Sequence, residues 1–265
     1  MNQPITITFS NCTHKGMQRT DNQDAYGKFP TDNDALTNPM GQLFIVADGM
    51  GGHLAGKEAS QMAVRIVPEA YFAGGAETLP QSLQRAMESA NEQIYHHSKS
   101  SAEFRGMGTT CTVLALKDDR AYVGHVGDSR AYRITRDQIE LLTKDHSKVA
   151  EMQRLGILTP EEARKHPEKS HLYRALGIAA AVQVDLSDDL VFTPDDHFLL
   201  CTDGLAKVGD REIKKIVLSN SPQQACRKLI DLANKRGGAD NVTIQVIRIE
   251  SGEKARSFFH RLRGR

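Results

Sequence analysis

Carboxylates at the ends of apolar segments are the residues of this chain with the clearest chemical potential. The apolar run Leu43–Ala47 predicts a strand buried on both faces, and it ends in Asp48 within a glycine-rich turn. A second apolar run ends in Asp203, and Asp240 precedes a third. One Asp-Gly dipeptide predicts only an ordinary turn, but the repetition of this pattern predicts a functional cluster.

Asp24 adds a fourth carboxylate at a loop–strand boundary. Four such groups held close together would raise one another's pKa unless cations neutralise them. A site made only of oxygen ligands suits hard dications such as Mg²⁺ or Mn²⁺. A carboxylate shared by two such ions is typical of phosphoryl hydrolysis, in which a bridging water becomes hydroxide near neutral pH and attacks in line. Arg19 adds a planar donor that suits a phosphate group.

Length and charge limit the possible functions. The 265 residues predict one large domain or two small ones, and the hydrophobic content of 39% is enough for a sizeable core. The formal net charge of +1 gives no support for a nucleic-acid partner. Residues 251–265 hold five basic residues and one acidic residue, a net charge of +4, so residues 1–250 carry −3. We therefore expect a mildly acidic body and a basic tail.

Cysteine usage and hydropathy predict a cytoplasmic protein. The four cysteines are scattered and form no C-x-x-C pair or zinc-ligand spacing. Cys111 and Cys201 lie in apolar runs, which predicts buried free thiols. The first residues resemble no signal peptide, and no apolar run reaches the roughly 20 residues of a membrane span.

Periodicity predicts one α+β domain without internal repeats. We expect a half-buried strand near Ile5–Phe9, followed by a polar loop. Strands are expected at Cys111–Leu116, Ala121–Val126, Ala131–Ile134 and Ile139–Leu142 as one antiparallel meander, and at Leu43–Ala47, Val182–Leu186, His197–Thr202 and Val242–Ile249. Helices are expected at His53–Phe72, Leu79–Ser98, Asp210–Leu218 and Pro222–Arg236. The polar segment 144–176 predicts one or two short helices in a mobile excursion.

Seven motifs occur in one order along nearly the whole chain, from about residue 8 to residue 249. They are Arg19-x-x-Asn22-x-Asp24, Val46-x-Asp48-Gly49-Met50-Gly51-Gly52, Gly108-Thr109-Thr110, Gly127-Asp128-Ser129-Arg130, Thr143-x-Asp145-His146-Ser147, Thr202-Asp203-Gly204-Leu205 and Gly238-x-Asp240-Asn241-Val242-Thr243. This series resembles that of the metal-dependent (PPM or 2C-type) serine/threonine protein phosphatases, in their bacterial version. Seven motifs in order are far more specific than any one of them.

The resemblance implies a fold and a domain plan. It implies a four-layer αββα sandwich, in which two central, mostly antiparallel sheets are flanked by helices. Residues 1–250 would form the phosphatase domain, and residues 144–176 its flap beside the substrate cleft. Residues 251–265 lie beyond the matching motifs, and their composition predicts a basic, disordered tail.

The resemblance also implies roles for individual residues. Asp48 would bridge two metal ions, and the Gly49 carbonyl would help to hold the second. Asp203 and Asp240 would complete the first site, and Asp24 would order metal-bound waters. Arg19 would grip the phosphoryl group, and Asp128 with Asp203 would form a weaker third site.

The implied activity is hydrolysis of phosphoserine and phosphothreonine in proteins, with Mn²⁺ or Mg²⁺ as cofactor. Attack by a water or hydroxide that bridges the two metals would reverse the action of a bacterial serine/threonine kinase. The implied protein is a monomer whose partners are phosphorylated proteins and that kinase.

Two positions depart from animal relatives. Those relatives have a histidine, a candidate general acid, where this chain has Met50, which cannot donate a proton. They also have glutamate in place of Gln23, so the second metal is expected to bind more weakly here. His53 could substitute as the acid, but a polar residue at a helix start is the favoured interpretation. His146 is interpreted as a flap or capping residue.

Other interpretations stay open from the residues alone. Thr109 and Thr110 could be simple strand formers, and Asp128 could be only a hairpin residue. A non-catalytic binding module would keep the fold, although the intact carboxylates argue against it. A nucleotide-binding loop at Gly49–Gly56 lacks both G-x-G-x-x-G and a Walker ending. The tail could bind a membrane surface through Phe258, Phe259 and Leu262, although a solvated end is favoured.

Overall fold

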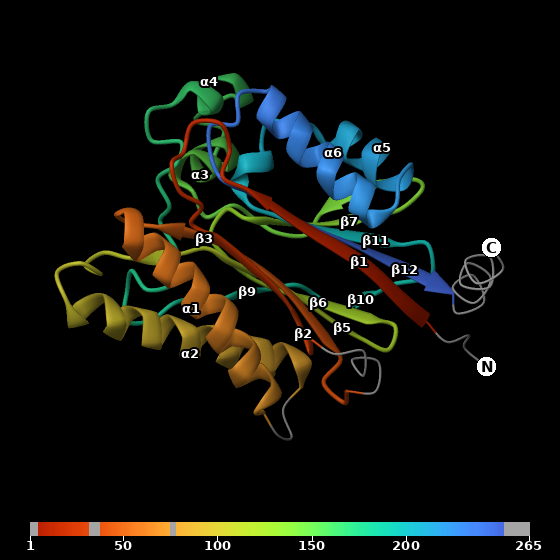
Figure 1. The fold of residues 1–265 in the computed structure, drawn as a ribbon, viewed down its shortest axis with the longest axis horizontal. Coiled ribbons are helices and arrows are strands. Elements are labelled where there is room, and N and C mark those ends of the chain that lie inside the picture. Colours follow the sequence, from red (N-terminus) through yellow and green to blue (C-terminus); the bar gives the residue numbers. More distant parts are fainter. Residues whose placement is uncertain (1–4, 32–37, 75–77, 252–265) are drawn as a thin grey trace.

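Two antiparallel β-sheets packed face to face form the centre of the molecule (Figure 1). The computed structural model describes residues 5–31, 38–74 and 78–251. Within these residues one sheet has the strand order β10-β6-β5-β3-β2, with β4 and β9 paired to β3 and β6. The other sheet has the order β1-β12-β11-β7-β8. Helices cover both outer faces, so the predicted αββα sandwich is confirmed.

The strands of each sheet and the helices have the following bounds. The first sheet contains β2 (Asp24–Phe29), β3 (Gln42–Met50), β4 (Gly108–Thr109), β5 (Cys111–Lys117), β6 (Arg120–Val126), β9 (Asp185–Leu186) and β10 (Leu190–Val191). The second contains β1 (Ile5–His14), β7 (Arg130–Ile134), β8 (Ile139–Leu141), β11 (His197–Cys201) and β12 (Val242–Ser251). The helices are α1 (His53–Phe72), α2 (Leu79–Ser100), α3 (Lys148–Arg154), α4 (Pro160–Lys165), η2 (Asp203–Leu205), α5 (Asp210–Leu218) and α6 (Pro222–Lys235).

Three apolar clusters hold the four layers together. One lies between the first sheet and helices α1 and α2, a second between the second sheet and helices α5 and α6, and a third between the sheets. Strand β3 contributes to two of them, because Leu43 and Ile45 face the helices while Phe44 and Val46 face the other sheet. The uninterrupted apolar run in the sequence is thereby explained, and each fully buried side chain of this size contributes about 1.5–3 kcal/mol.

The predicted single meander is wrong. Strands β5 and β6 pair in one sheet, whereas β7 and β8 pair in the other. The chain crosses between the sheets at residues 127–129, where Gly127 has φ +114°. A tight hairpin and a crossing both use Gly-Asp, so the sequence pattern could not separate them.

Other boundaries also differ from the predictions. Strand β1 continues to His14, into the expected polar loop, because all ten of its residues pair with β12. Strand β2 was not predicted, and the segment predicted at Val182–Leu186 is a strand only over its last two residues. Cys111 and Cys201 are buried free thiols, as predicted.

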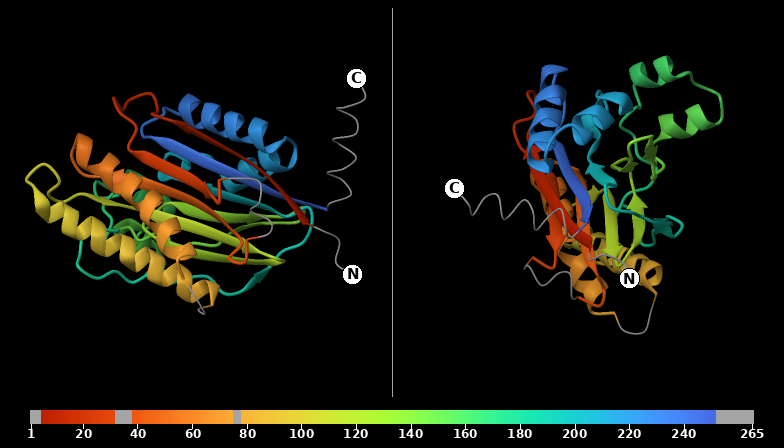
Figure 2. Two further views of the ribbon diagram at one scale, coloured as in Figure 1. Left: turned by 60° about the horizontal axis from the view of Figure 1, so that its bottom comes forward. Right: turned by 90° about the vertical axis from the view of Figure 1, so that its right-hand side faces the viewer.

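Residues 144–176 form an excursion from the sandwich and carry α3 and α4 (Figure 2). Ser147 and Thr159 cap the two helices through their side chains. Leu155 and Ile157 are 65% and 59% exposed, so this segment adds little to the core. Among the described residues no helix is both long and apolar enough to cross a membrane. The proposed tail at residues 251–265 lies outside the described residues, apart from Ser251 in β12.

Candidate active site

The predicted carboxylates meet at one end of the sandwich, and both sheets contribute. Asp24 begins β2 directly opposite Asp48 in β3. Asp203 begins η2 after β11, and Asp240 lies just before β12. Asp128 lies in the crossing between β6 and β7. The structure therefore brings together residues that are up to 216 positions apart in the sequence.

The pKa values of these groups show how close and how buried they are. Burial is the main cause that raises the pKa of Asp48 well above its usual range, and the charges of the other four carboxylates add to it. Burial also raises the pKa of Asp24 to about 7. Burial, followed by the charge of Asp240, raises that of Asp203 to about 6. The pKa of Asp128 rises to about 8, through burial and then the charge of Asp203.

Two carboxylate oxygens in the cluster lack the partners that buried oxygens normally have. Oδ1 of Asp24 and Oδ1 of Asp203 are buried and accept no hydrogen bond within the described part of the chain. Oδ2 of Asp24 accepts a hydrogen bond from the Thr202 hydroxyl at 2.8 Å. A buried acceptor without a donor is costly, and a bound dication would remove that cost. The all-oxygen donor set therefore fits Mg²⁺ or Mn²⁺.

The carboxylates supply suitable ligand atoms, but without an ion they are not arranged as a complete metal-binding set. No group of three or more His, Cys, Asp or Glu residues in the described ranges has an arrangement that could hold a metal ion. Arg19 donates to Oδ2 of Asp240 at 2.7 Å, with the arginine side chain 54% exposed. An arginine in this position blocks one oxygen of Asp240, and it stands at the edge of the cluster where a phosphate could reach it.

Two threonines fix the backbone at Asp48. The hydroxyl of Thr110 accepts from the Asp48 N–H at 2.9 Å, and the hydroxyl of Thr109 donates to the Asp48 carbonyl at 2.9 Å. The Thr110 hydroxyl also lies 2.7 Å from the Ser129 hydroxyl, beside Asp128. Thr109 ends β4, Thr110 lies between β4 and β5, and both side chains hold the carboxylate-bearing backbone. Sequence reasoning left that role open, because hydroxyl–backbone pairing over about 60 residues leaves no local signal.

Asn241 fixes the loop that carries Arg19. Its side-chain NH₂ group donates to the carbonyls of Lys15 and Asp21, at 2.9 and 2.8 Å. Its side-chain oxygen accepts from the Gln23 N–H at 2.8 Å. Sequence reasoning assigned no role to this residue, although its place directly after Asp240 was a signal.

The glycines at Gly49 and Gly56 allow strand β3 and helix α1 to touch through their backbones. A Cβ on Gly49 would overlap the Gly56 carbonyl and would lie 2.8 Å from the Gln23 carbonyl oxygen. The Gly49 N–H donates to that Gln23 oxygen at 3.2 Å. Close packing accounts for Gly49 and Gly56 without a nucleotide.

The two candidate histidines and the two positions that depart from animal relatives lie on different elements. Met50 ends β3 opposite Gly108. His53 is the first residue of α1, as predicted. His146 is buried just before the α3 cap, so the interpretation as a flap or capping residue fits its position. Gln23 precedes β2 and carries no charge to the cluster.

Comparison with known proteins identifies the family. The family model described as protein phosphatase 2C matches residues 13–243. The serine/threonine phosphatase stp of Listeria monocytogenes serotype 4b is 36% identical over 251 residues, which cover 92% of this chain and 96% of the relative. The crystal structure of Stp1 from Staphylococcus aureus superposes with a TM-score of 0.83 at 34% identity, covering 94% of this chain and 98% of the other.

A third relative is the catalytic domain of the phosphatase PstP, described as a complex with two manganese ions. It matches with a TM-score of 0.80 at 29% identity and covers 93% of this chain and all of that one. The chain belongs to the protein phosphatase 2C family. It is a protein-serine/threonine phosphatase of the bacterial type.

Proposed function

We propose that this chain hydrolyses phosphoserine and phosphothreonine in proteins with two divalent ions, Mn²⁺ or Mg²⁺, held by the carboxylate cluster. The observation that carries the proposal is the buried cluster itself, in which Asp24 and Asp203 each present a buried oxygen without a donor. The manganese ions described for the related PstP structure support the choice of metal. When bound, such ions neutralise the carboxylates and supply a nucleophilic hydroxide near neutral pH.

The residues divide the work by position. Asp48, on which the charges of the other four carboxylates act, would be shared by both ions, with the Gly49 carbonyl on the second. Asp203 and Asp240 would hold the first ion, and Asp24 would orient water beside it. Sharing one carboxylate keeps the two ions close enough to act on one phosphoryl group.

Arg19 would bind and orient the phosphoryl group. Its bond to Asp240 would be exchanged for bonds to phosphate oxygens, which match the flat guanidinium fork. Asp128 together with Asp203 would hold a third, weaker ion. The charge of Asp203 raises the pKa of Asp128, so these two groups lie close enough to share a cation.

Metal dependence tests the proposal. Pure protein stripped with EDTA should be inactive on a phosphothreonine peptide and should recover with Mn²⁺ or Mg²⁺. Asp48→Asn should remove activity, whereas Asp137→Asn in the exposed β7–β8 turn should not. Full activity in EDTA, or an Asp48→Asn variant as fast as the parent, contradicts the proposal. An active Asp48→Asn variant would mean that the attacking water is activated elsewhere than at Asp48.

The cellular role follows from this chemistry. We propose a cytoplasmic, monomeric signalling enzyme that reverses a serine/threonine kinase on shared phosphoproteins. The four free cysteines support a reducing compartment. A serine/threonine kinase encoded beside this chain would identify the partner, and deletion of the phosphatase should then raise phosphothreonine on that kinase's substrates.

A further inference from the structure

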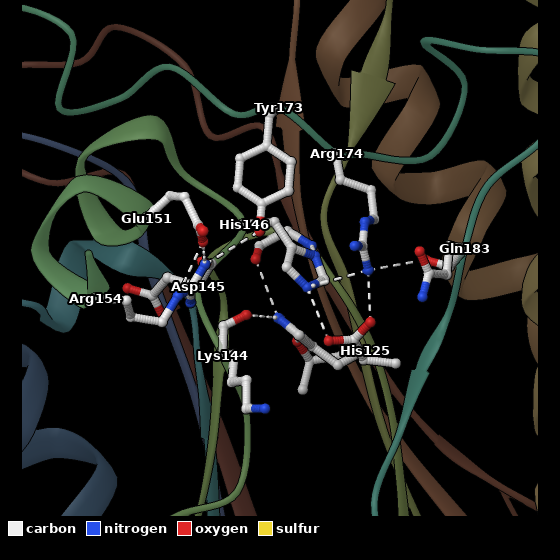
Figure 3. Close-up of polar contacts among 12 residues, drawn as sticks. His125, Lys144, Asp145, His146, Glu151, Arg154, Tyr173, Arg174 and Gln183 are labelled. Carbon is white, nitrogen blue, oxygen red and sulfur yellow. Dashed lines mark hydrogen bonds and ion pairs between the residues drawn. The ribbon is translucent and has the colours of Figure 1, made fainter.

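The backbone of Gly127, directly before Asp128, takes part in three hydrogen-bonding contacts. Its carbonyl accepts from the His146 N–H at 2.7 Å and lies 3.0 Å from Nε2 of His125. Its N–H donates to Nδ1 of His146 at 3.0 Å. The side chains of His146 and His125 lie beside each other (Figure 3). A Cβ on Gly127 would lie 2.6 Å from Cβ of Thr110, so only glycine fits. Two histidines therefore determine where the chain enters Asp128.

The hydrogen bonds fix the tautomer of His146. Because Nδ1 accepts from a backbone N–H, the ring proton must be on Nε2. Nε2 faces Oδ2 of Asp185 at 3.1 Å, and Arg174 donates to the other oxygen of that carboxylate at 2.5 Å. Burial lowers the pKa of His146, which keeps the ring neutral and its Nδ1 lone pair available.

His125 contacts the carbonyl of the same residue, Gly127. Its Nδ1 lies 2.9 Å from the Thr112 hydroxyl, and its Nε2 is shared between the carbonyls of Gly127 and Lys144. Burial lowers the pKa of His125 to about 4, so this ring also stays uncharged. The centroids of the two imidazole rings are 4.9 Å apart.

His146 also belongs to the base of the flap. Its carbonyl accepts from the Tyr173 N–H at 3.0 Å, and the centroids of its ring and the Tyr173 ring are 5.6 Å apart. The isolated bridge between Ser147 and Leu172 continues this pairing. His146 thus connects three segments: the crossing at Gly127, the flap at Tyr173 and strand β9 at Asp185.

We infer that His146 is a positioning residue for Asp128: its Nδ1 fixes the Gly127 peptide, and Asp185 holds the ring in the required orientation. The inference rests on the proposed role of Asp128 with Asp203 at a third ion. Residues behind a metal ligand commonly change metal affinity by about 10-fold to 100-fold when they are lost. His146 should therefore control the weak ion and leave the two core ions unaffected.

Two substitutions separate positioning from simple packing. His146→Asn keeps an acceptor at the place of Nδ1, whereas His146→Gln puts its amide near Nε2 and leaves the Gly127 N–H without a partner. His96→Gln, at an exposed position on α2, is the control. Mn²⁺ binding to the full chain would be measured by calorimetric titration, and exchange of the Gly127 amide proton by NMR.

His146→Gln should weaken the lowest-affinity Mn²⁺ site by about tenfold or more, keep the two tight ions, and speed Gly127 exchange by at least a similar factor. His146→Asn should stay within about threefold of the parent on both readouts. Parental Mn²⁺ affinity and Gly127 exchange in His146→Gln would overturn the inference. Equal losses in both variants would overturn it as well, because the ring would then act only as packing.

Two further measurements keep the test decisive. If a His146 variant fails to fold, Asp185→Ala, at a half-exposed position, removes the acceptor for Nε2–H. It should speed Gly127 exchange by a smaller factor, and unchanged exchange would refute the inference. If the parent binds only two ions, the proposed third site is wrong. The Gly127 exchange rates of the Asn and Gln variants still decide whether His146 holds that peptide.

Discussion

Asp48 and Asp128 belong to the same cluster, but the protein holds them in different ways. Asp48 lies two residues before the end of a nine-residue strand, β3, which pairs with β2 on one side and with β5 and β4 on the other. Asp128 lies in a short crossing whose backbone is held by two histidine side chains, His125 from the preceding strand β6 and His146 from the base of the flap. Strand pairing fixes the backbone of Asp48 through many backbone hydrogen bonds, whereas the backbone of the crossing depends on a few side-chain contacts. Loss of one contact should therefore matter more at Asp128.

The largest expected effect concerns Asp203, which interacts with both residues of this comparison. Asp203→Ala should abolish turnover, because this carboxylate adjoins both Asp48 and Asp128 and would serve the first and third ions. Several kcal/mol of lost charge stabilisation correspond to about 10³-fold or more in rate. Initial rates on a phosphothreonine peptide at saturating Mn²⁺ would measure the loss. A residual rate within tenfold of the parent would mean that Asp203 holds no essential ion.

The second prediction concerns the stability of the metal-free protein. Folding raises the pKa values of Asp24, Asp203 and Asp128 to about 7, 6 and 8, so the folded state binds more protons than the unfolded chain. Stability in EDTA should therefore fall as the pH rises from about 5 to 8, the reverse of the usual carboxylate behaviour. One pKa unit corresponds to about 1.4 kcal/mol, so a loss of a few kcal/mol is expected.

Thermal unfolding across that pH range, with EDTA and with Mn²⁺, would measure the effect. Bound Mn²⁺ should flatten the pH dependence, because it replaces the protons. A metal-free protein whose Tm is constant or rises over this range would show that the carboxylates are better solvated than the structure indicates.

The predictable part of this molecule is the part in which local pattern and final packing agree. Helices α1 and α5 have the bounds that their periodicity predicts, because each presents one apolar stripe to a sheet. The apolar run Leu43–Ala47 predicts a strand buried on both faces, and the structure confirms this. Carboxylates at strand ends could be predicted for the same reason, since strand ends converge at a sheet edge.

The remaining features depend on contacts between distant segments. Nothing local distinguishes the crossing at Gly127 from a hairpin, since the difference lies in which sheet the next strand joins. His146 meets Asp185, 39 residues further on, and Thr110 meets Ser129 across the crossing. Side-chain bonds of this kind leave no periodic signal, so the roles of His146, Thr110 and Asn241 required the structure.

The third prediction concerns Asp128 in the crossing between the sheets. Asp128→Ala should keep two Mn²⁺ ions by calorimetric titration and should lose about 10-fold to 100-fold in rate on a protein substrate. Asp137→Ala, in the exposed β7–β8 turn, is the matched control and should change neither readout. An Asp128→Ala protein that unfolds, or that keeps the parental rate, would show that Asp128 is only a turn residue.

The smallest expected effect concerns position 50, the last residue of the same strand that carries Asp48. Expelling a serine or threonine alkoxide requires a proton more than expelling an aryl phenolate does, because the alkoxide is far more basic. A positioned acid typically contributes about 10²- to 10⁴-fold, and the Met50 thioether cannot serve as one. Met50→His should therefore raise kcat on a phosphothreonine peptide relative to an aryl phosphate. The gain should be only a few-fold, about tenfold at most, because a water or another side chain must already supply the proton in the parent and the site was not shaped for imidazole. Rates on both substrates between about pH 6 and 9, with Mn²⁺ affinity measured in parallel, would decide the matter, since an imidazole titrates near pH 6.5. An unchanged ratio at parental metal affinity would show that position 50 faces away from the leaving group.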